Sequence, residues 1–247
     1  MIYKKRRECL IIGGPCSVSS KKELYETAKE ISNYVDIFRC GVWKARTNPN
    51  SFSGLGNITI NWLSNISQEL NLPIAIEIGL PCHVEKALEK NIRIFWIGAR
   101  TTVNPFAVNE ICESLKGEDV EVWVKNPIHP DLKVWAGAIE RFQKTGIKNL
   151  KAIHRGFFPY YKTIYRNPPK WKLIKEFQKM APEIELICDP SHIAGNTRLL
   201  KNISKKAIKN GVMGLMIEAH CSPKNALSDA KQQLKPKEFK RLINSIF

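Results

Sequence analysis

The sequence predicts an α/β fold, a single (β/α)₈ barrel that spans residues 1–247 as one domain. Eight short apolar segments, rich in β-branched and aromatic residues, alternate with eight segments of helical pattern. The length of 247 residues is typical of such a barrel, and no linker or low-complexity tract divides the chain. An open, doubly wound sheet has a similar alternation and is the main alternative.

The predicted elements follow one another at short intervals. The strands are runs without proline beyond their first residue, as buried parallel strands require, at 9–13, 37–43, 73–78, 92–97, 120–124, 150–154, 184–188 and 212–217. The helices are amphipathic segments at 21–34, 58–69, 83–90, 105–114, 133–145, 170–180, 197–210 and 237–246. Helix-start signals support two of them, because Ser20 precedes the first and Asn104 precedes the fourth. Functional residues are then expected on the loops that follow the strands, at one face of the barrel.

Composition limits the classes of protein to consider. No apolar run approaches the roughly 18 residues that a membrane span needs, and the N-terminal apolar run is too short for a signal peptide, so a cytoplasmic protein is expected. Seven cysteines without a CxxC pair argue against a disulfide scaffold and a zinc knuckle. The net charge of +16 favours anionic partners, which include nucleic acid, acidic lipid and phosphorylated metabolites.

Four potential metal ligands follow three of the predicted strands. Cys16 follows the first strand, His192 the seventh, and Glu218 ends the eighth, with Asp229 in the loop beyond it. Strands seven, eight and one become contiguous when a barrel closes, so the four side chains could converge on one ion. This mixture of soft and hard ligands suits Mn, Fe, Co or Zn better than Mg or Ca.

The other histidines are weaker candidates. His220 lies two residues beyond Glu218 and could be an alternate ligand or a group that supports the ligands. His83, His129 and His154 are assigned structural or peripheral positions.

Basic residues recur at the same face of the predicted barrel. They lie on or just after the second, fourth, fifth and sixth strands: Arg39, Lys44, Arg46, Arg100, Lys125 and Arg155. A cation at the end of a buried strand needs a counter-charge, and a bound phosphate or carboxylate would supply it. Each one alone could be an ordinary solvated residue, but the clustering favours an anion-binding site.

Several motifs carry a family resemblance. They run in family order over roughly residues 10–235: Gly14-Pro15-Cys16-Ser17, Lys44-Ala45-Arg46-Thr47-Asn48-Pro49, Phe52-Ser53-Gly54-Leu55-Gly56, Ile97-Gly98-Ala99-Arg100, Asp189-Pro190-Ser191-His192 with Gly195, Met216-Ile217-Glu218-Ala219-His220 and Leu227-Ser228-Asp229. By these motifs the chain resembles the type I 3-deoxy-D-arabino-heptulosonate 7-phosphate (DAHP) synthases, which share ancestry with the 3-deoxy-D-manno-octulosonate 8-phosphate synthases.

The resemblance implies a metal-dependent enzyme that condenses phosphoenolpyruvate with erythrose 4-phosphate. Its divalent ion, Mn, Fe, Co or Zn, would be held by Cys16, His192, Glu218 and Asp229, two of which, Cys16 and His192, count with Lys44 as catalytic. Substrate roles are implied for a set of residues, with phosphoenolpyruvate held by Arg39, Lys44, Arg100, Lys125 and Arg155, and the aldose phosphate by Arg46 and Thr47. The expected assembly is a homo-oligomer, a dimer or tetramer, without a nucleic-acid or membrane partner and without a separate regulatory domain.

Departures and alternatives remain. Ala45 stands where the family has proline, Asn126 where relatives have arginine, and His154 where an acidic residue is expected. Lys44-x-Arg46-Thr47 favours the four-carbon acceptor, whereas an octulosonate 8-phosphate synthase would use arabinose 5-phosphate. A basic nucleic-acid-binding protein and a catalytically inactive regulatory barrel are the alternatives from other classes.

Overall fold

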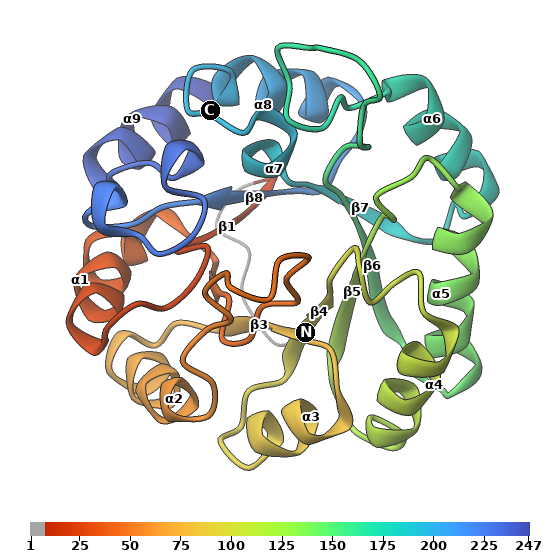
Figure 1. The fold of residues 1–247 in the computed structure, drawn as a ribbon, viewed down its shortest axis with the longest axis horizontal. Coiled ribbons are helices and arrows are strands. Elements are labelled where there is room, and N and C mark those ends of the chain that lie inside the picture. The colour runs from red at the N-terminus through yellow and green to blue at the C-terminus, as the bar shows by residue number, and fades with distance from the viewer. Residues whose placement is uncertain (1–7) are drawn as a thin grey trace.

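Eight parallel strands close into a barrel in the computed structural model of the chain, which describes residues 8–247. The strand order is β1 to β8 in sequence, and the helices surround the barrel (Figure 1). This confirms the predicted (β/α)₈ barrel and excludes the open doubly wound sheet.

The strands agree with the predicted segments, although β1, β5 and β8 end one residue later than predicted and β6 begins one residue earlier. Their bounds are β1 (Leu10–Gly14), β2 (Ile37–Cys40), β3 (Ile74–Ile78), β4 (Ile94–Ile97), β5 (Glu121–Lys125), β6 (Asn149–His154), β7 (Glu185–Cys188) and β8 (Gly214–Glu218). The predicted second strand is three residues too long, because the chain leaves the sheet at Gly41. A Cβ atom there would lie 2.3 Å from the Cys16 carbonyl oxygen, so only glycine lets the two loops approach so closely.

The helices agree with the prediction in number and order, with one addition. Their bounds are α1 (Lys21–Ile31), α2 (Ile58–Leu70), α3 (Pro81–Leu88), α4 (Pro105–Ser114), α5 (Leu132–Lys144), α6 (Trp171–Met180), α7 (Pro190–Ala194), α8 (Leu200–Lys209) and α9 (Pro236–Ile246). The Ser20 side chain accepts a hydrogen bond from the Glu23 amide, and Asn104 caps α4 in the same way, so both predicted start signals are confirmed.

The additional helix, α7, is five residues long and was not predicted, because it is too short for a periodic pattern. The Asp189 side chain accepts from the His192 amide at its start. Gly195 ends it in the left-handed conformation, with φ at 69°.

Two apolar layers hold the barrel together. Alternate strand residues fill its interior, among them Ile12, Trp96 and Trp123, while their neighbours, such as Ile11 and Phe95, pack under the helices. Parallel strands buried on both faces read as the continuous apolar runs on which the prediction rested. No helix within residues 8–247 is long and apolar enough to cross a membrane.

The closing pair of strands sets the geometry of the face above the barrel. β1 and β8 pair over their whole length, from Leu10 opposite Gly214 to Gly14 opposite Glu218. The loop that follows β1 therefore begins directly beside Glu218. Residues 8–247 also contain three 3₁₀ turns, η1 (Ser32–Tyr34), η2 (Pro223–Asn225) and η3 (Ala230–Gln232), and the last two lie in the loop beyond β8.

Candidate functional site

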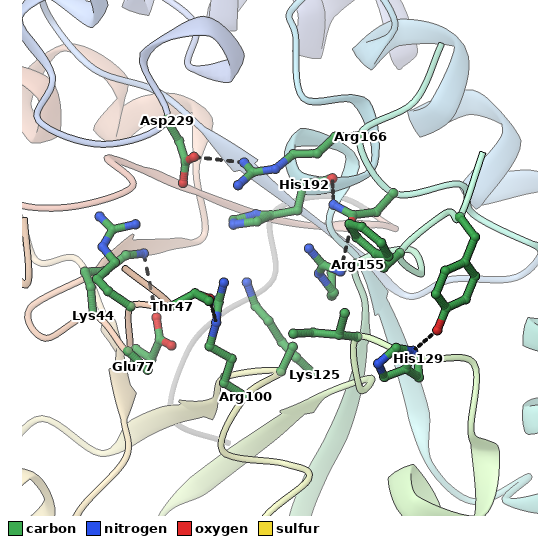
Figure 2. A pocket seen from close by; sticks show the side chains of 18 residues that line it. Lys44, Thr47, Glu77, Arg100, Lys125, His129, Arg155, Arg166, His192 and Asp229 are labelled. Atoms are coloured by element: carbon green, nitrogen blue, oxygen red, sulfur yellow. Dashed lines mark hydrogen bonds and ion pairs between the residues drawn. The ribbon is translucent and has the colours of Figure 1, made fainter. Parts of the chain in front are cut away.

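A cavity of about 480 Å³ opens at the carboxyl ends of the strands. Side chains from β3 and from the loops after six other strands reach it, and Figure 2 shows them converging on a common space. Eight of the predicted site residues line it: Lys44, Arg46, Thr47, Arg100, Lys125, Arg155, His192 and Asp229. The other three, Cys16, Arg39 and Glu218, are buried.

Three of the four predicted metal ligands meet beside this cavity. The possible ligand atoms of Cys16, Glu218 and Asp229 all lie within 4.8 Å of one another. The Cys16 thiol donates to Asp229 Oδ2 at 3.0 Å, although 213 residues separate the two in sequence. His192 is outside that group but adjacent to it, with Nδ1 3.8 Å from Glu218 Oε1, and Figure 2 shows its ring extending into the same space as Asp229 and Arg166.

Burial and charge set the protonation of these groups. Burial raises the pKa of the Cys16 thiol to about 12, and the nearby Glu218 charge adds to the effect, so the thiol keeps its proton when no cation is close. Burial also opposes ionisation of the two carboxyl groups, but the positive charge of Arg39 lowers the pKa of Glu218, and that of Arg166 lowers the pKa of Asp229. Burial lowers the pKa of His192, which favours a neutral ring.

The donor set therefore fits a divalent cation. Two carboxylates and a neutral imidazole are already in the protonation states that a metal requires, and the thiol would lose its proton on binding. Soft sulfur beside carboxylate and imidazole favours a transition metal or zinc over Mg or Ca. The mutually close negative charges of buried Glu218 and half-buried Asp229 would be stabilised by such an ion.

Asp189 holds the imidazole, and sequence reasoning assigned it no role. Its Oδ1 accepts from the His192 backbone amide at 3.0 Å, while its Oδ2 lies 2.8 Å from His192 Nδ1 and 2.9 Å from Lys125 Nζ. With Nδ1 against a carboxylate, Nε2 is the nitrogen left for a ligand. The signal was present in the sequence, since the Asp189-Pro190-Ser191-His192 motif combines a helix cap with its first turn.

A group of cations lies across the cavity from the carboxylates. Arg155 is buried, and burial lowers its pKa to about 10. It donates to Asn167 Oδ1 at 2.9 Å and forms no ion pair with a carboxylate among residues 8–247. Arg100 donates to Thr47 Oγ1 at 3.0 Å, which ties the loop after β4 to the loop after β2. A phosphate or carboxylate in the cavity would be attracted to this group.

Lys44 lies between the two groups. Its Nζ donates to the Cys16 carbonyl oxygen at 3.1 Å, is 3.4 Å from Cys16 Sγ and 3.7 Å from Glu77 Oε2. Arg46, on the same loop, donates through Nε to the Phe52 carbonyl oxygen at 2.7 Å and also faces the cavity. The loop thus places an ammonium group beside the predicted metal ligands.

Arg39 lies beneath the site and does not line the cavity. Its Nη1 donates to Glu218 Oε1 at 2.9 Å, and its guanidinium carbon is 4.8 Å from the centre of the Trp96 ring. Among the described residues, Nε and Nη2 have no hydrogen-bond partner. Arg39 therefore supports a metal ligand directly, and its contact with a substrate stays a prediction.

Two of the unusual residues have structural explanations. The Asn126 amide donates to the Pro127 and Gly156 carbonyl oxygens, both at 2.8 Å, and its Oδ1 accepts from the Arg155 backbone amide at 2.7 Å. It thus positions Arg155 from below. His154 is buried against Phe157 and Trp171, and burial lowers its pKa to about 3, so it is neutral.

The structure adds residues to the site and separates others from it. Arg166, Asn167 and Glu77 line the cavity, and so does His129, which was expected to be peripheral and whose Nδ1 is 2.9 Å from the Tyr160 hydroxyl. No spacing in the sequence marks Arg166, Asn167 or His129, because they project from irregular loops, and Glu77 is a single acidic residue on β3. His220 groups instead with Glu23 and Cys221, away from the other three ligands. Its Nδ1 accepts from the Ser222 amide, which leaves the proton on Nε2 and disfavours metal binding there.

Two aldolases align with this chain over nearly its whole length. A phospho-2-dehydro-3-deoxyheptonate aldolase from Thermotoga maritima is 29% identical over 237 residues, which cover 96% of this chain and 68% of that protein. A 2-dehydro-3-deoxyphosphooctonate aldolase from Bartonella henselae is 21% identical over 270 residues, covering all of this chain and 91% of the relative.

Solved structures agree with the sequence matches. The crystal structure of the Thermotoga maritima phospho-2-dehydro-3-deoxyheptonate aldolase (DAHP synthase) superposes with a TM-score of 0.86 at 28% identity, over 96% of this chain and 68% of that one. A truncated form of the 3-deoxy-D-arabino-heptulosonate 7-phosphate synthase from the same organism gives 0.82 at 25% identity, over 96% and 85%. The sequence pattern of the DAHP synthetase I family matches residues 3–246. The chain belongs to the DAHP synthetase I family.

Proposed function

We propose that the chain is a metal-dependent DAHP synthase, which condenses phosphoenolpyruvate with erythrose 4-phosphate and water to give DAHP and phosphate, the first step of aromatic amino acid (shikimate) biosynthesis. The observation that carries this proposal is the joint presence, in and beside one cavity of a DAHP synthetase I family member, of a thiol–carboxylate cluster and a group of cations. The cluster accounts for a divalent ion, and the cations account for two phosphorylated substrates.

The substrate positions follow from the charges. Arg100, Lys125 and Arg155 would bind the phosphate and carboxylate of phosphoenolpyruvate, together with Lys44 and with Arg39 from below. Arg46 and Thr47, at the cavity edge, would bind the phosphate of the aldose. Preorganised cations of this kind fix the two reactants and stabilise charge that develops during the reaction.

The ion would be held by Cys16, His192, Glu218 and Asp229, and when bound it supplies Lewis acidity toward the aldehyde oxygen or orients the attacking water. In the reaction, C3 of phosphoenolpyruvate forms a bond to the aldehyde carbon, water adds at C2, and the C2–O bond to phosphate breaks. Lys44 Nζ, beside Cys16, would donate a proton to the alkoxide that forms from the aldehyde. The cations at the phosphate end stabilise the departing phosphate.

The donor set suits Mn, Fe, Co or Zn, and elemental analysis of the purified protein would identify which one is present. A homo-oligomer, dimer or tetramer, a cytoplasmic location and a single catalytic barrel over residues 1–247 remain part of the proposal. Light scattering after size-exclusion chromatography would test the assembly.

One assay tests the activity and its acceptor. Metal-reconstituted protein is given phosphoenolpyruvate with erythrose 4-phosphate or, separately, with arabinose 5-phosphate, and phosphate release is followed. We expect release with erythrose 4-phosphate. Release only with arabinose 5-phosphate would instead assign the octulosonate 8-phosphate reaction, and release with neither would contradict the proposal.

A further inference from the structure

The side-chain amide of Gln232 contacts Glu218 directly and is linked to Asp229 through Arg166, so it connects the two carboxylates of the candidate metal cluster. We infer that Gln232 is a positioning residue that holds Glu218 and Asp229 in the arrangement that binds the ion. This inference rests on the proposed metal site and adds to it a residue that is not itself one of the proposed ligands.

The contacts form one continuous chain. Gln232 Nε2 donates to Glu218 Oε2 at 2.7 Å, and Gln232 Oε1 accepts from Arg166 Nη1 at 2.8 Å. The same Arg166 Nη1 donates to Asp229 Oδ1 at 2.8 Å. Gln232 is 1% exposed, so water competes little for these bonds.

The chemistry of its neighbours fixes the orientation of the amide. An arginine can only donate and an ionised carboxylate can only accept, so the amide oxygen must face Arg166 and the NH₂ group must face Glu218. A flipped amide would lose both bonds. Arg166 therefore determines that a donor points at Glu218, and the carboxylate is held from one side by Gln232 and from the other by Arg39, at 2.9 Å on Oε1.

The backbone makes this connection rigid. Gln232 ends the 3₁₀ turn η3, which starts directly after Asp229. The backbone amide of Gln232 donates to the Asp229 carbonyl oxygen at 3.1 Å. Asp229 itself has a φ of 50°, a left-handed conformation that costs a non-glycine residue free energy. Leu234 then pairs with the end of β8, donating to the Glu218 carbonyl oxygen at 3.0 Å. One short segment thus carries a metal ligand and the side chain that orients another.

Asp229 divides its two oxygens between different partners. Oδ1 accepts from Arg166, while Oδ2 lies 3.0 Å from Cys16 Sγ on the side of the other ligands. Supporting residues of this kind change metal affinity by about 10- to 100-fold when they are removed. Because Gln232 is uncharged, its substitution changes the positions of the ligands without altering the net charge around the ion.

Binding of Mn²⁺ to metal-stripped protein, measured from the EPR signal of free Mn²⁺, tests the inference. Gln232→Met keeps the size of the side chain and removes both hydrogen-bonding groups. Gln232→Asn keeps an amide but is one methylene too short to reach Glu218 and Arg166 together. The matched control is Gln178→Met on α6, where the side-chain amide donates to the Asn210 carbonyl oxygen.

We expect Mn²⁺ affinity to fall about tenfold or more in both Gln232 variants and to stay within about twofold of wild type in Gln178→Met. Melting of the metal-free proteins separates this from a general packing defect, which would lower the melting temperature without changing the affinity of the folded protein. If Gln232→Met does not fold, Gln232→Asn decides. Wild-type affinity in the folded Gln232 variants would overturn the inference, whereas a wild-type protein that binds no Mn²⁺ would contradict the proposed metal site itself.

Discussion

Lys125 Nζ lies 2.9 Å from Asp189 Oδ2, and both side chains are almost completely buried at the base of the cavity. The same carboxylate oxygen is 2.8 Å from His192 Nδ1. One buried aspartate thus contacts both Lys125, which is proposed to bind phosphoenolpyruvate, and His192, which is proposed to bind the metal. The substrate-binding region and the metal-binding region of the cavity are therefore connected through Asp189.

Replacing Lys125 should impair use of phosphoenolpyruvate. Lys125→Met removes a cation from the anion-binding group and leaves Asp189 with one charged partner fewer, and breaking a buried pair costs about 3–5 kcal/mol. We expect kcat/KM for phosphoenolpyruvate to fall at least about 100-fold. Steady-state kinetics measure this, with exposed Lys133→Met as the control; an unchanged rate and KM would remove Lys125 from the site.

Removal of the metal should stop turnover. We expect chelator treatment to abolish phosphate release and added Mn²⁺ to restore it, because the close carboxylates of Glu218 and Asp229 need a cation between them. Cys16→Ala should lose both metal content and activity, whereas exposed Cys82→Ala should keep them. Full turnover in chelator would rule out a metal-dependent mechanism.

A methyl group at Gly195 should displace Arg166. A Cβ atom there would lie 2.5 Å from Arg166 Cβ, and the φ of 69° is itself unfavourable for alanine. Gly117 has a φ of 84° with nothing near its Cβ position, so Gly117→Ala measures the backbone effect alone, about 1–2 kcal/mol. Urea unfolding of the metal-free proteins should show that Gly195→Ala lowers the free energy of unfolding more than Gly117→Ala does. Equal decreases in the free energy of unfolding would mean that the Arg166 side chain moves away without destabilising the protein.

The stability of the protein should fall on acidification, in part because of His154. Its folded-state pKa of about 3 lies below the ordinary 6.5, so between these values the unfolded chain binds the additional proton. Stability is therefore lost as the pH falls from about 6.5 toward 3, by on the order of 3 kcal/mol at pH 4 from this group. His83, whose pKa burial lowers to about 4, acts in the same direction.

His154→Phe keeps a ring between Phe157 and Trp171 but cannot bind the proton. Free energies of unfolding in urea, measured in chelator at pH 4.5 and 7.5, should therefore differ less in this variant than in wild type. A His154→Phe protein with the wild-type pH dependence would show that His154 does not contribute.

The sequence predicted the barrel and most of the site because both depend on regular patterns. Apolar runs located the strands, and closure of the ring brought the ends of β1 and β8 together, so Cys16, Glu218 and Asp229 could be expected to meet. Arg166 and Gln232 could not be found in this way. Arg166 projects from an irregular loop and Gln232 from a short 3₁₀ turn, and their importance lies in hydrogen bonds between residues that are distant in sequence, which no periodicity encodes. Arg39 shows the same limit, since its strand position was evident but its burial beneath Glu218 was not.

The pairing of the first and last strands has a consequence for how the molecule opens. β1 matches β8 over five consecutive residues, whereas it meets β2 only at Ile12 and Gly13, and β8 meets β7 only at Gly214 and Leu215. Native-state hydrogen exchange should therefore find the two terminal strands exchanging as one ribbon, with its weak edges on either side. On such opening, Cys16, Glu218 and Asp229 would move together with β1 and β8. His192, which follows β7, would keep its place. An ion bound to all four residues would link β8 to the segment beyond β7, where the two strands share few backbone pairs. It would therefore slow the opening of the β1–β8 pair in addition to its role in the reaction.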